Sequence, residues 1–183
     1  MNYFQELKER DGRVGDMKPH KKPEDMNRER QDIPFVIKWL SDLGIYGFKE
    51  AIYYEQINGV DLIQESTGKT YEVKIRYKPR YLKKDILIEV KSKIEEDTPG
   101  WIVYSKANLL VYVFLKNNKI LGGHIFDLPL LRMWWFAVGQ FRNYPIKESP
   151  NTGYTTLNYA VPLGDIPQSM YKYSTVLRGK NHL

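Results

Sequence analysis

Hydrophobic residues recur every three or four positions between Asp32 and Gly44, and this spacing predicts an amphipathic helix. Asp32 can cap the first turn of this helix, and Gly44 can end the helix. Pro34 suits the first turn, where the backbone N–H groups have no partner within the helix. The predicted helix therefore carries one apolar face that must pack against the rest of the fold.

Shorter apolar stretches separated by turn residues follow this helix, and they predict β-strands. The letters ESTG and KNNK are typical of turns between neighbouring strands, and DTPG breaks the chain before Trp101. Ser105 can then cap a short helical turn, and the strongly apolar stretch 128–141 predicts another helix. The predicted strands are 51–56, 59–64, 70–77, 85–92, 109–115, 120–126 and 155–161.

This order of helix, strands, crossover, further strands and helix predicts an α/β (α+β) fold, a central mixed β-sheet flanked by helices. The length of 183 residues suits one domain. Residues 1–31 are dense in charges of both signs and poor in aliphatic side chains, so we expect a flexible or loosely helical arm. The single domain then spans 32–183, with a tyrosine-rich C-terminal extension at 143–183.

The composition narrows the kinds of protein to consider. The chain has no cysteine, which excludes disulfides and thiolate metal sites and suits the reducing cytoplasm. No apolar run reaches the roughly 18 residues of a membrane span, so we expect no membrane partner. The net charge of +6 makes nucleic acid the first candidate for a binding partner.

Asp61, Glu72 and Lys74 lie on two predicted strands, and the register of these strands decides which of them meet. If the turn between the strands has four residues, Asp61 faces Glu72 at a Cβ distance of about 5 Å. Lys74 is then on the same face as Glu72, because side chains alternate along a strand. If the turn has only two residues, Asp61 faces Lys74 and the set is an ordinary cross-strand ion pair.

The first register would bring together groups with a specific chemistry. Two opposed carboxylates repel each other unless a cation lies between them, and their oxygens suit a hard ion such as Mg²⁺. Such an ion is a Lewis acid and lowers the pKa of a bound water, while a nearby lysine orients that water or neutralises charge on a phosphate. Hydrolysis of a phosphodiester needs these groups and neither cysteine nor histidine.

A second Glu-Val-Lys stretch begins at Glu89, and it is a weaker candidate for an active site. The nearest acidic residue before it is Asp85, which is too close for a hairpin to present the two carboxylates together. We expect Glu89 and Lys91 on a solvated strand face. Glu89 would lie next to Asp61, Glu72 and Lys74 only if its strand pairs with 70–77.

The letters GVDL at 59–62 and YEVK at 71–74 together resemble the Asp…(Glu)-x-Lys signature of the PD-(D/E)XK nuclease superfamily. The resemblance is to a phage and bacterial branch and covers about 32–132, through ILIE at 86–89, GW at 100–101, SKAN at 105–108 and the apolar run after it. Val60 replaces the usual proline, and Asn108 stands where an aspartate is expected. The resemblance implies the restriction-endonuclease-like fold.

The resemblance also implies an activity, which is metal-dependent hydrolysis of DNA by an endo- or exodeoxyribonuclease through attack by a Mg²⁺-activated water. Asp61 and Glu72 would be metal ligands, the backbone carbonyl of Val73 a further ligand, and Lys74 the catalytic lysine. Mn²⁺ would be a substitute for Mg²⁺, and RNA an alternative substrate. Candidate supporting acidic residues would be Glu50, Glu55 and Glu89, and simple surface charge is the alternative for Glu50 and Glu55. The alternatives are an inactive nucleic-acid-binding module of the same fold and a structural or interaction protein.

The stretch RYKPRYLKK at 76–84 has five basic residues and no acidic one. It follows directly after the strand that carries Lys74, so its charges could contact phosphates and its tyrosines could stack on unpaired bases. A solvated hairpin tip is the alternative. The candidate nucleic-acid contacts are Arg76, Tyr77, Lys78, Arg80, Tyr81, Lys83, Lys84 and Lys106.

Trp134, Trp135 and Phe136 lie in the second predicted helix. We expect them in the core or at an interface between two copies of the chain, which leaves a homodimer open. His124 lies in a predicted strand, where we expect a structural role.

Overall fold

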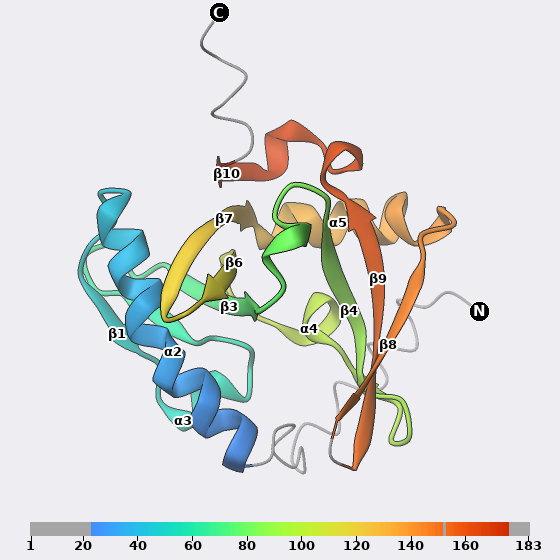
Figure 1. Cartoon of the computed structure of the whole chain (residues 1–183), viewed down its shortest axis with the longest axis horizontal. Coiled ribbons are helices and arrows are strands. Elements are labelled where there is room, and N and C mark those ends of the chain that lie inside the picture. Colours follow the sequence, from blue (N-terminus) through green and yellow to red (C-terminus); the bar gives the residue numbers. More distant parts are fainter. Residues whose placement is uncertain (1–22, 152, 176–183) are drawn as a thin grey trace, which may run out of the picture.

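A computed structural model gives the fold for residues 23–151 and 153–175, with the backbone alone for residues 23–30 (Figure 1). Two sheets make up most of it, one with the strand order β1-β2-β3-β6-β7-β10 and one with the order β5-β4-β9-β8. The first sheet consists of β1 (Phe48–Glu50), β2 (Leu62–Gln64), β3 (Thr70–Arg76), β6 (Leu109–Lys116), β7 (Lys119–Asp127) and β10 (Tyr171–Ser174). The second consists of β4 (Asp85–Lys93), β5 (Thr98–Pro99), β8 (Ile146–Asn151) and β9 (Tyr154–Pro162). The helices are α2 (Pro23–Asp42), α3 (Tyr53–Gln56), α4 (Trp101–Tyr104) and α5 (Leu128–Ala137).

Alternate side chains of the central strands divide between two cores. On one face of the first sheet, Tyr71 and Val73 of β3 pack with Val111 of β6 against Val36 and Leu40 of α2. This alternation is what a strand buried on both faces requires. The helix α2 therefore covers this face of the sheet, as its apolar spacing predicts (Figure 1).

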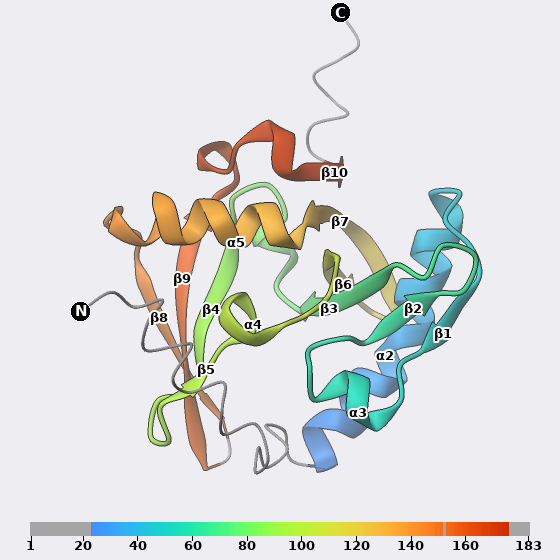
Figure 2. The same cartoon turned by 180° about the vertical axis from the view of Figure 1, so that it is seen from behind.

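The opposite face of the first sheet packs against α4, α5 and the second sheet. Its core includes Leu110 of β6, Ile88 of β4, Trp101 of α4 and Trp135 of α5. The helix α5 starts where the carboxylate of Asp127 accepts the backbone N–H of Leu130 at 3.1 Å, which is ordinary N-terminal capping. Figure 2 shows α5 crossing this side of the molecule and α4 lying between β3 and β4.

The first sheet is mixed, because β6 runs parallel to β3 while its other strand pairs are antiparallel. The crossover between β3 and β6 contains β4, β5 and α4. The strand β4 pairs with β9 from the C-terminal part of the chain, so the crossover and that part together build the second sheet. A mixed sheet with flanking helices confirms the α/β class, and the second sheet was not foreseen.

Several predicted boundaries were wrong. The helix α2 begins at Pro23 and not at Asp32, and it contains Pro34, because helix formers precede its apolar stripe. Residues 23–31, expected to be flexible or loosely helical, belong to this same helix. The rest of the predicted arm, 1–22, lies outside the described residues, as do residues 152 and 176–183 of the predicted extension. None of the described helices is both long and apolar enough to cross a membrane.

Two local predictions also fail. Residues 53–56 form the one-turn helix α3 and not a strand, because the Glu55 carboxylate accepts the backbone N–H of Ile52 at 2.8 Å and closes the turn. Ser105 follows α4 and does not begin it, since its backbone N–H already bonds to the carbonyl of Trp101.

His124 has the structural role expected of it, and it couples stability to pH. Its Nε2 lies 3.3 Å from the carbonyl of Leu82 and must donate there, so Nδ1 accepts from the Ser174 hydroxyl at 2.9 Å. Both nitrogens of the neutral ring therefore have a hydrogen-bond partner. Burial lowers the pKa of His124 to about 4.

The free energy of unfolding should therefore fall as the pH is lowered from about 6.5 to 4, because only the unfolded chain binds a proton to this ring in that range. The stabilisation is fully present above pH 6.5, and its loss amounts to roughly 3 kcal/mol for this residue. Urea unfolding at a series of pH values measures it, and His124→Gln should flatten the dependence in this window. An equal slope in both proteins would show that other groups cause it.

Candidate active site

The structure decides between the two registers of the β2–β3 hairpin. Leu62 pairs with Tyr71, and the backbone N–H of Gln64 donates to the carbonyl of Lys69 at 2.8 Å. This is the register of the four-residue turn, and continuing it by one residue sets Asp61 opposite Glu72. The alternative, in which Asp61 faces Lys74, is wrong.

Asp61 lies just where β2 leaves β3, and its side chain takes over the pairing. Its Oδ2 accepts the backbone N–H of Val73 at 2.7 Å. In an extended strand the N–H and C=O of one residue point to the same neighbour, so the Val73 carbonyl points to the side of Asp61 as well. The oxygens of Asp61 and Val73 therefore lie along one edge of β3.

Glu72 and Lys74 form an ion pair on the face of β3 that looks toward the second sheet. The Nζ of Lys74 lies 2.6 Å from Oε1 of Glu72. The side chain of Glu72 is 2% exposed, and that of Lys74 is 18% exposed. A carboxylate buried to this degree keeps its charge only with such a partner. The prediction that the two side chains share a face is confirmed.

Tyr104, at the end of α4, belongs to this cluster and was missed by the sequence analysis. Burial is the main cause that raises the pKa of its hydroxyl well above the ordinary value. Four charged side chains also act on that hydroxyl, namely Glu72, Lys74, Glu89 and Asp61. Tyr104 thus stays neutral, and its hydroxyl lies within electrostatic reach of the main candidate residues.

Glu89 lies near the cluster, but not because its strand pairs with β3. Its strand, β4, pairs with β9 and β5 in the second sheet and not with β3. Close packing of α4 on β4 brings it near, because a Cβ at Gly100 would lie 2.3 Å from the Glu89 carbonyl. The negative charge of Glu89 therefore contributes to the raised pKa of Tyr104.

Arg132 of α5 holds the end of α4 in place behind Glu72. Its Nε donates to the carbonyl of Ile102 at 2.8 Å, and its guanidinium also donates to the carbonyl of Ser105. Burial lowers the pKa of Arg132, while the charge of Glu72 raises it. This guanidinium adds positive potential to the site and orients the residues on both sides of Tyr104.

Gly59 makes the close approach of its loop to the site sterically feasible. Its φ of +70° lies in the left-handed region, and an added Cβ would lie 2.7 Å from both the Glu72 Oε2 and the Ser105 Cβ. The Ser105 hydroxyl donates to the Gly59 carbonyl at 2.7 Å, which ties this loop to the end of α4.

Gly59→Ala should lower the free energy of unfolding by about 2–4 kcal/mol, from backbone strain together with the clash against Glu72 and Ser105. Gly68→Ala is the matched control, since Gly68 has a φ of +68° but open space around it. Gly68→Ala should lower the free energy of unfolding by about 1–2 kcal/mol, from backbone strain alone. Chemical denaturation measures both, and equal losses would show that the clash has no effect.

The other acidic candidates, Glu50 and Glu55, have no hydrogen bond or ion pair with the cluster in the part of the chain that the structure describes. The Glu55 carboxylate is engaged in closing α3, and Glu50 is exposed on β1 opposite Leu62. The structure therefore gives Glu55 a local structural role, whereas Glu50 lies on the surface.

The start of the basic stretch is bound within the fold. Arg76 pairs with Asp85 at 2.5 Å, and its guanidinium lies 4.2 Å from the ring centroid of Tyr81. Arg80 lies 5.0 Å from the same ring, so the Tyr81 ring faces charged groups of its own chain. The Tyr77 hydroxyl donates to Asp32 at 2.6 Å. These contacts tie β3 to β4 and to α2.

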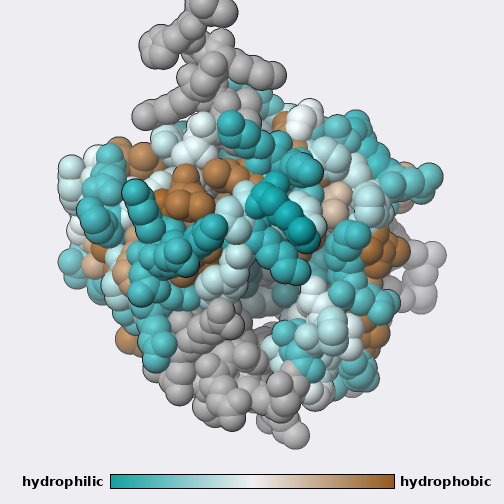
Figure 3. Space-filling model, viewed as in Figure 1, coloured by the Kyte–Doolittle hydropathy of each residue, from teal (hydrophilic) through white to brown (hydrophobic). Residues whose placement is uncertain are grey.

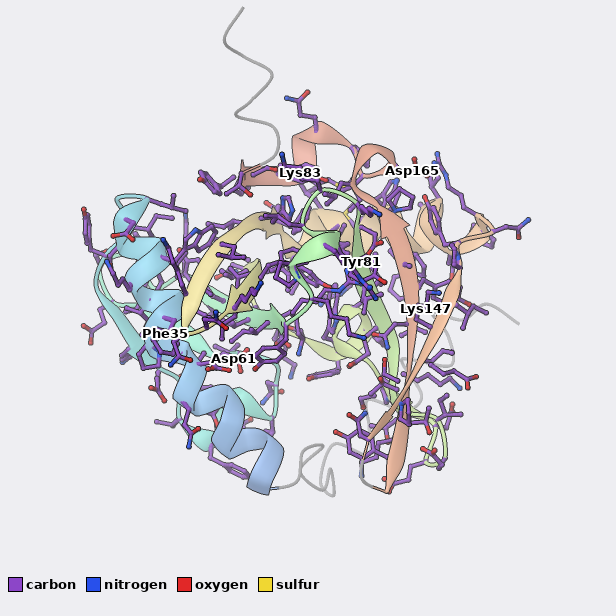
Figure 4. The ribbon with its side chains drawn as sticks, viewed as in Figure 1. Phe35, Asp61, Tyr81, Lys83, Lys147 and Asp165 are labelled. Atoms are coloured by element: carbon purple, nitrogen blue, oxygen red, sulfur yellow. The ribbon has the colours of Figure 1, made fainter. Side chains whose placement is uncertain are left out.

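The remaining basic candidates are on the surface. Figure 3 shows hydrophilic side chains over much of this face and a hollow between the part that carries α2 and the part that carries β8 and β9. Figure 4 shows Lys83 and Tyr81 above the level of Asp61. The exposed cations are Lys78, Arg80, Lys83, Lys84 and Lys106.

Among the residues that the structure describes, no three His, Cys, Asp or Glu side chains form a group able to hold a metal ion. An ion at Asp61 and Glu72 would therefore need further oxygens, from the Val73 carbonyl, water or substrate. That requirement fits Mg²⁺, which keeps several waters and commonly binds one or two carboxylates together with phosphate oxygens.

Comparison of the chain with models of protein families, with curated proteins and with solved structures found no match.

Proposed function

We propose that the protein is a Mg²⁺-dependent nuclease that hydrolyses phosphodiester bonds of DNA at Asp61, Glu72 and Lys74. The observation that carries this proposal is the β2–β3 register, which when continued by one residue sets Asp61 opposite Glu72, with the Lys74 ammonium 2.6 Å from Glu72. Two carboxylates and a cation held by β3 and the residue beside it suit phosphoryl chemistry, whereas a lone cross-strand ion pair does not.

The residues fit a divalent ion. The Asp61 and Glu72 carboxylates and the Val73 carbonyl would hold it, and Mn²⁺ would be accepted at the same oxygens. The ion would supply Lewis acidity and lower the pKa of a water molecule.

The chain's own groups supply the rest of the chemistry. Lys74 places a positive charge beside Glu72, where it stabilises negative charge that develops on a phosphate. Tyr104 stays protonated because its pKa is raised, so it acts as a hydrogen-bond donor and not as a base. Arg132 and Ser105 keep the end of α4 and the Gly59 loop in position around these groups.

A second function has a specific observation in its favour. The Glu72 carboxylate already pairs with Lys74, and the Asp61 carboxylate already accepts the Val73 N–H, so both have partners within the chain itself. The same fold could therefore bind nucleic acid without cutting it. The exposed lysines of 78–84 serve either function.

A cleavage panel tests the proposal. Duplex, single-stranded and branched DNA, and RNA, are incubated with the protein in Mg²⁺, in Mn²⁺ and in EDTA. We expect cutting of DNA in either metal and none in EDTA, and a rise of the thermal midpoint on adding Mg²⁺. Binding without cutting in any metal would favour the second function, and neither binding nor cutting would contradict both.

A further inference from the structure

The helix α3 and the residue before it present three consecutive apolar side chains to solvent. Ile52 is 68% exposed, Tyr53 52% and Tyr54 71%. No residue of α3 is buried. Contiguous exposed apolar side chains of this kind mark interaction sites more often than scattered ones do.

Polar contacts hold α3 in place, so the local fold does not require these apolar side chains. Besides the Glu55 carboxylate on the Ile52 N–H, the Gln56 side chain donates to the Ala51 carbonyl at 2.9 Å. The Asn58 side chain donates to the Tyr54 carbonyl at 2.8 Å. The N-cap position that Ile52 occupies normally favours Ser, Thr, Asp or Asn.

The surface of Ile52, Tyr53 and Tyr54, called the α3 patch below, is joined directly to the candidate active site. The Ala51 N–H donates to the Asp61 carbonyl at 2.9 Å. On the other side of the loop, the Lys106 N–H donates to the Asn58 carbonyl at 2.8 Å, and Lys106 is exposed. Figures 1 and 2 show α3 at the lower end of the half that carries β1 and β2.

We propose that the α3 patch binds unpaired nucleotides of the DNA strand whose phosphodiester lies at Asp61, Glu72 and Lys74. Tyr53 and Tyr54 would stack on bases, and Lys106 would lie near a phosphate. This inference rests on the proposed function and specifies its substrate class, which is DNA with a single-stranded or splayed segment.

The chemistry favours this occupant over others. Every base offers a flat face to an aromatic ring, but in a duplex those faces are covered by neighbouring base pairs. The exposed Lys106 on the other side of the loop and the net charge of +6 over the whole chain favour a polyanion. The tyrosines of the basic stretch serve less well, because Tyr77 bonds to Asp32 and the Tyr81 ring faces two guanidinium groups.

Binding in EDTA tests the inference without catalysis. Fluorescence anisotropy measures the affinity for a labelled single-stranded oligothymidylate and for a blunt duplex, with wild type and the Tyr53→Ala/Tyr54→Ala variant. We expect the variant to bind the single strand about 5- to 150-fold more weakly and the duplex almost unchanged.

Tyr46→Ala is the matched control, because Tyr46 is 63% exposed but lies at the other end of β2, where its carbonyl accepts from the Gln64 side chain. It should bind like wild type. If the double variant binds the single strand as tightly as wild type, or changes the sedimentation of the free protein instead, the α3 patch has another partner and the inference is wrong.

The cleavage panel separates this failure from that of the proposed function. A protein that cuts DNA but shows no effect of the double variant refutes only the α3 patch. A protein that binds single strands through the patch and cuts nothing refutes only the nuclease.

Discussion

Lys74→Met should lower the free energy of unfolding by roughly 3 kcal/mol at neutral pH. Removal of one member of a buried ion pair leaves an uncompensated charge, which costs about 3–5 kcal/mol, and Glu72 is 2% exposed. We expect the lower end of that range because Arg132 also acts on Glu72. Urea unfolding monitored by tryptophan fluorescence measures the change.

The control uses a lysine with the same exposure and a solvated partner. Lys93 is also 18% exposed in its side chain, but its partner Glu96 is 62% exposed. Lys93→Met should therefore cost less than about 1 kcal/mol. Similar losses in the two variants would mean that the burial of Glu72 does not matter.

The double variant Glu72→Gln/Lys74→Met should recover most of the lost stability, because it removes the buried charge along with its partner. It should nevertheless cut no DNA, since a metal ligand and the cation are both absent. A double variant as unstable as Lys74→Met would show that the methionine packs poorly at this position.

Asp61→Asn should lower the rate of DNA cleavage by about 10²–10³-fold while changing stability by less than about 1 kcal/mol. The amide oxygen can still accept the Val73 N–H, so the edge of β3 keeps its hydrogen bond. The negative charge that would hold a divalent ion is lost. Single-turnover cleavage in saturating Mg²⁺ measures the rate.

Asp165→Asn provides a control with the same change of charge. Asp165 pairs with Arg142 on the surface, and Figure 4 shows it at the upper right, well apart from Asp61. This variant should cleave like wild type. If both variants lose activity equally, or if Asp61→Asn stays fully active, Asp61 is not part of the active site.

Much of this site follows from short-range rules. The period of two along a strand sets Glu72 and Lys74 on one face and Val73 on the other, and the structure has them so. The turn at 65–68, with Gly68 in the left-handed region, narrows the register to two alternatives. The choice between them depends on backbone bonds such as Gln64 to Lys69, which the letters do not specify.

The short helix α3 shows why local patterns can mislead. Tyrosine and isoleucine at 52–54 are typical of strands, but β-propensity reflects packing on a sheet, and these side chains are largely exposed. Side-chain contacts from Glu55, Gln56 and Asn58 to the backbone stabilise a helical turn instead.

The linear order of the chain thus carries the α/β class, the two faces of β3 and the pair of carboxylates with their lysine, because alternation and turn chemistry act over a few residues. It does not determine which other side chains surround these carboxylates. Tyr104, Glu89 and Arg132 come from α4, β4 and α5, and they act on the site only because these elements pack against the first sheet. Their electrostatic contact depends on distances across two packed cores, and such distances arise only when the whole chain has folded.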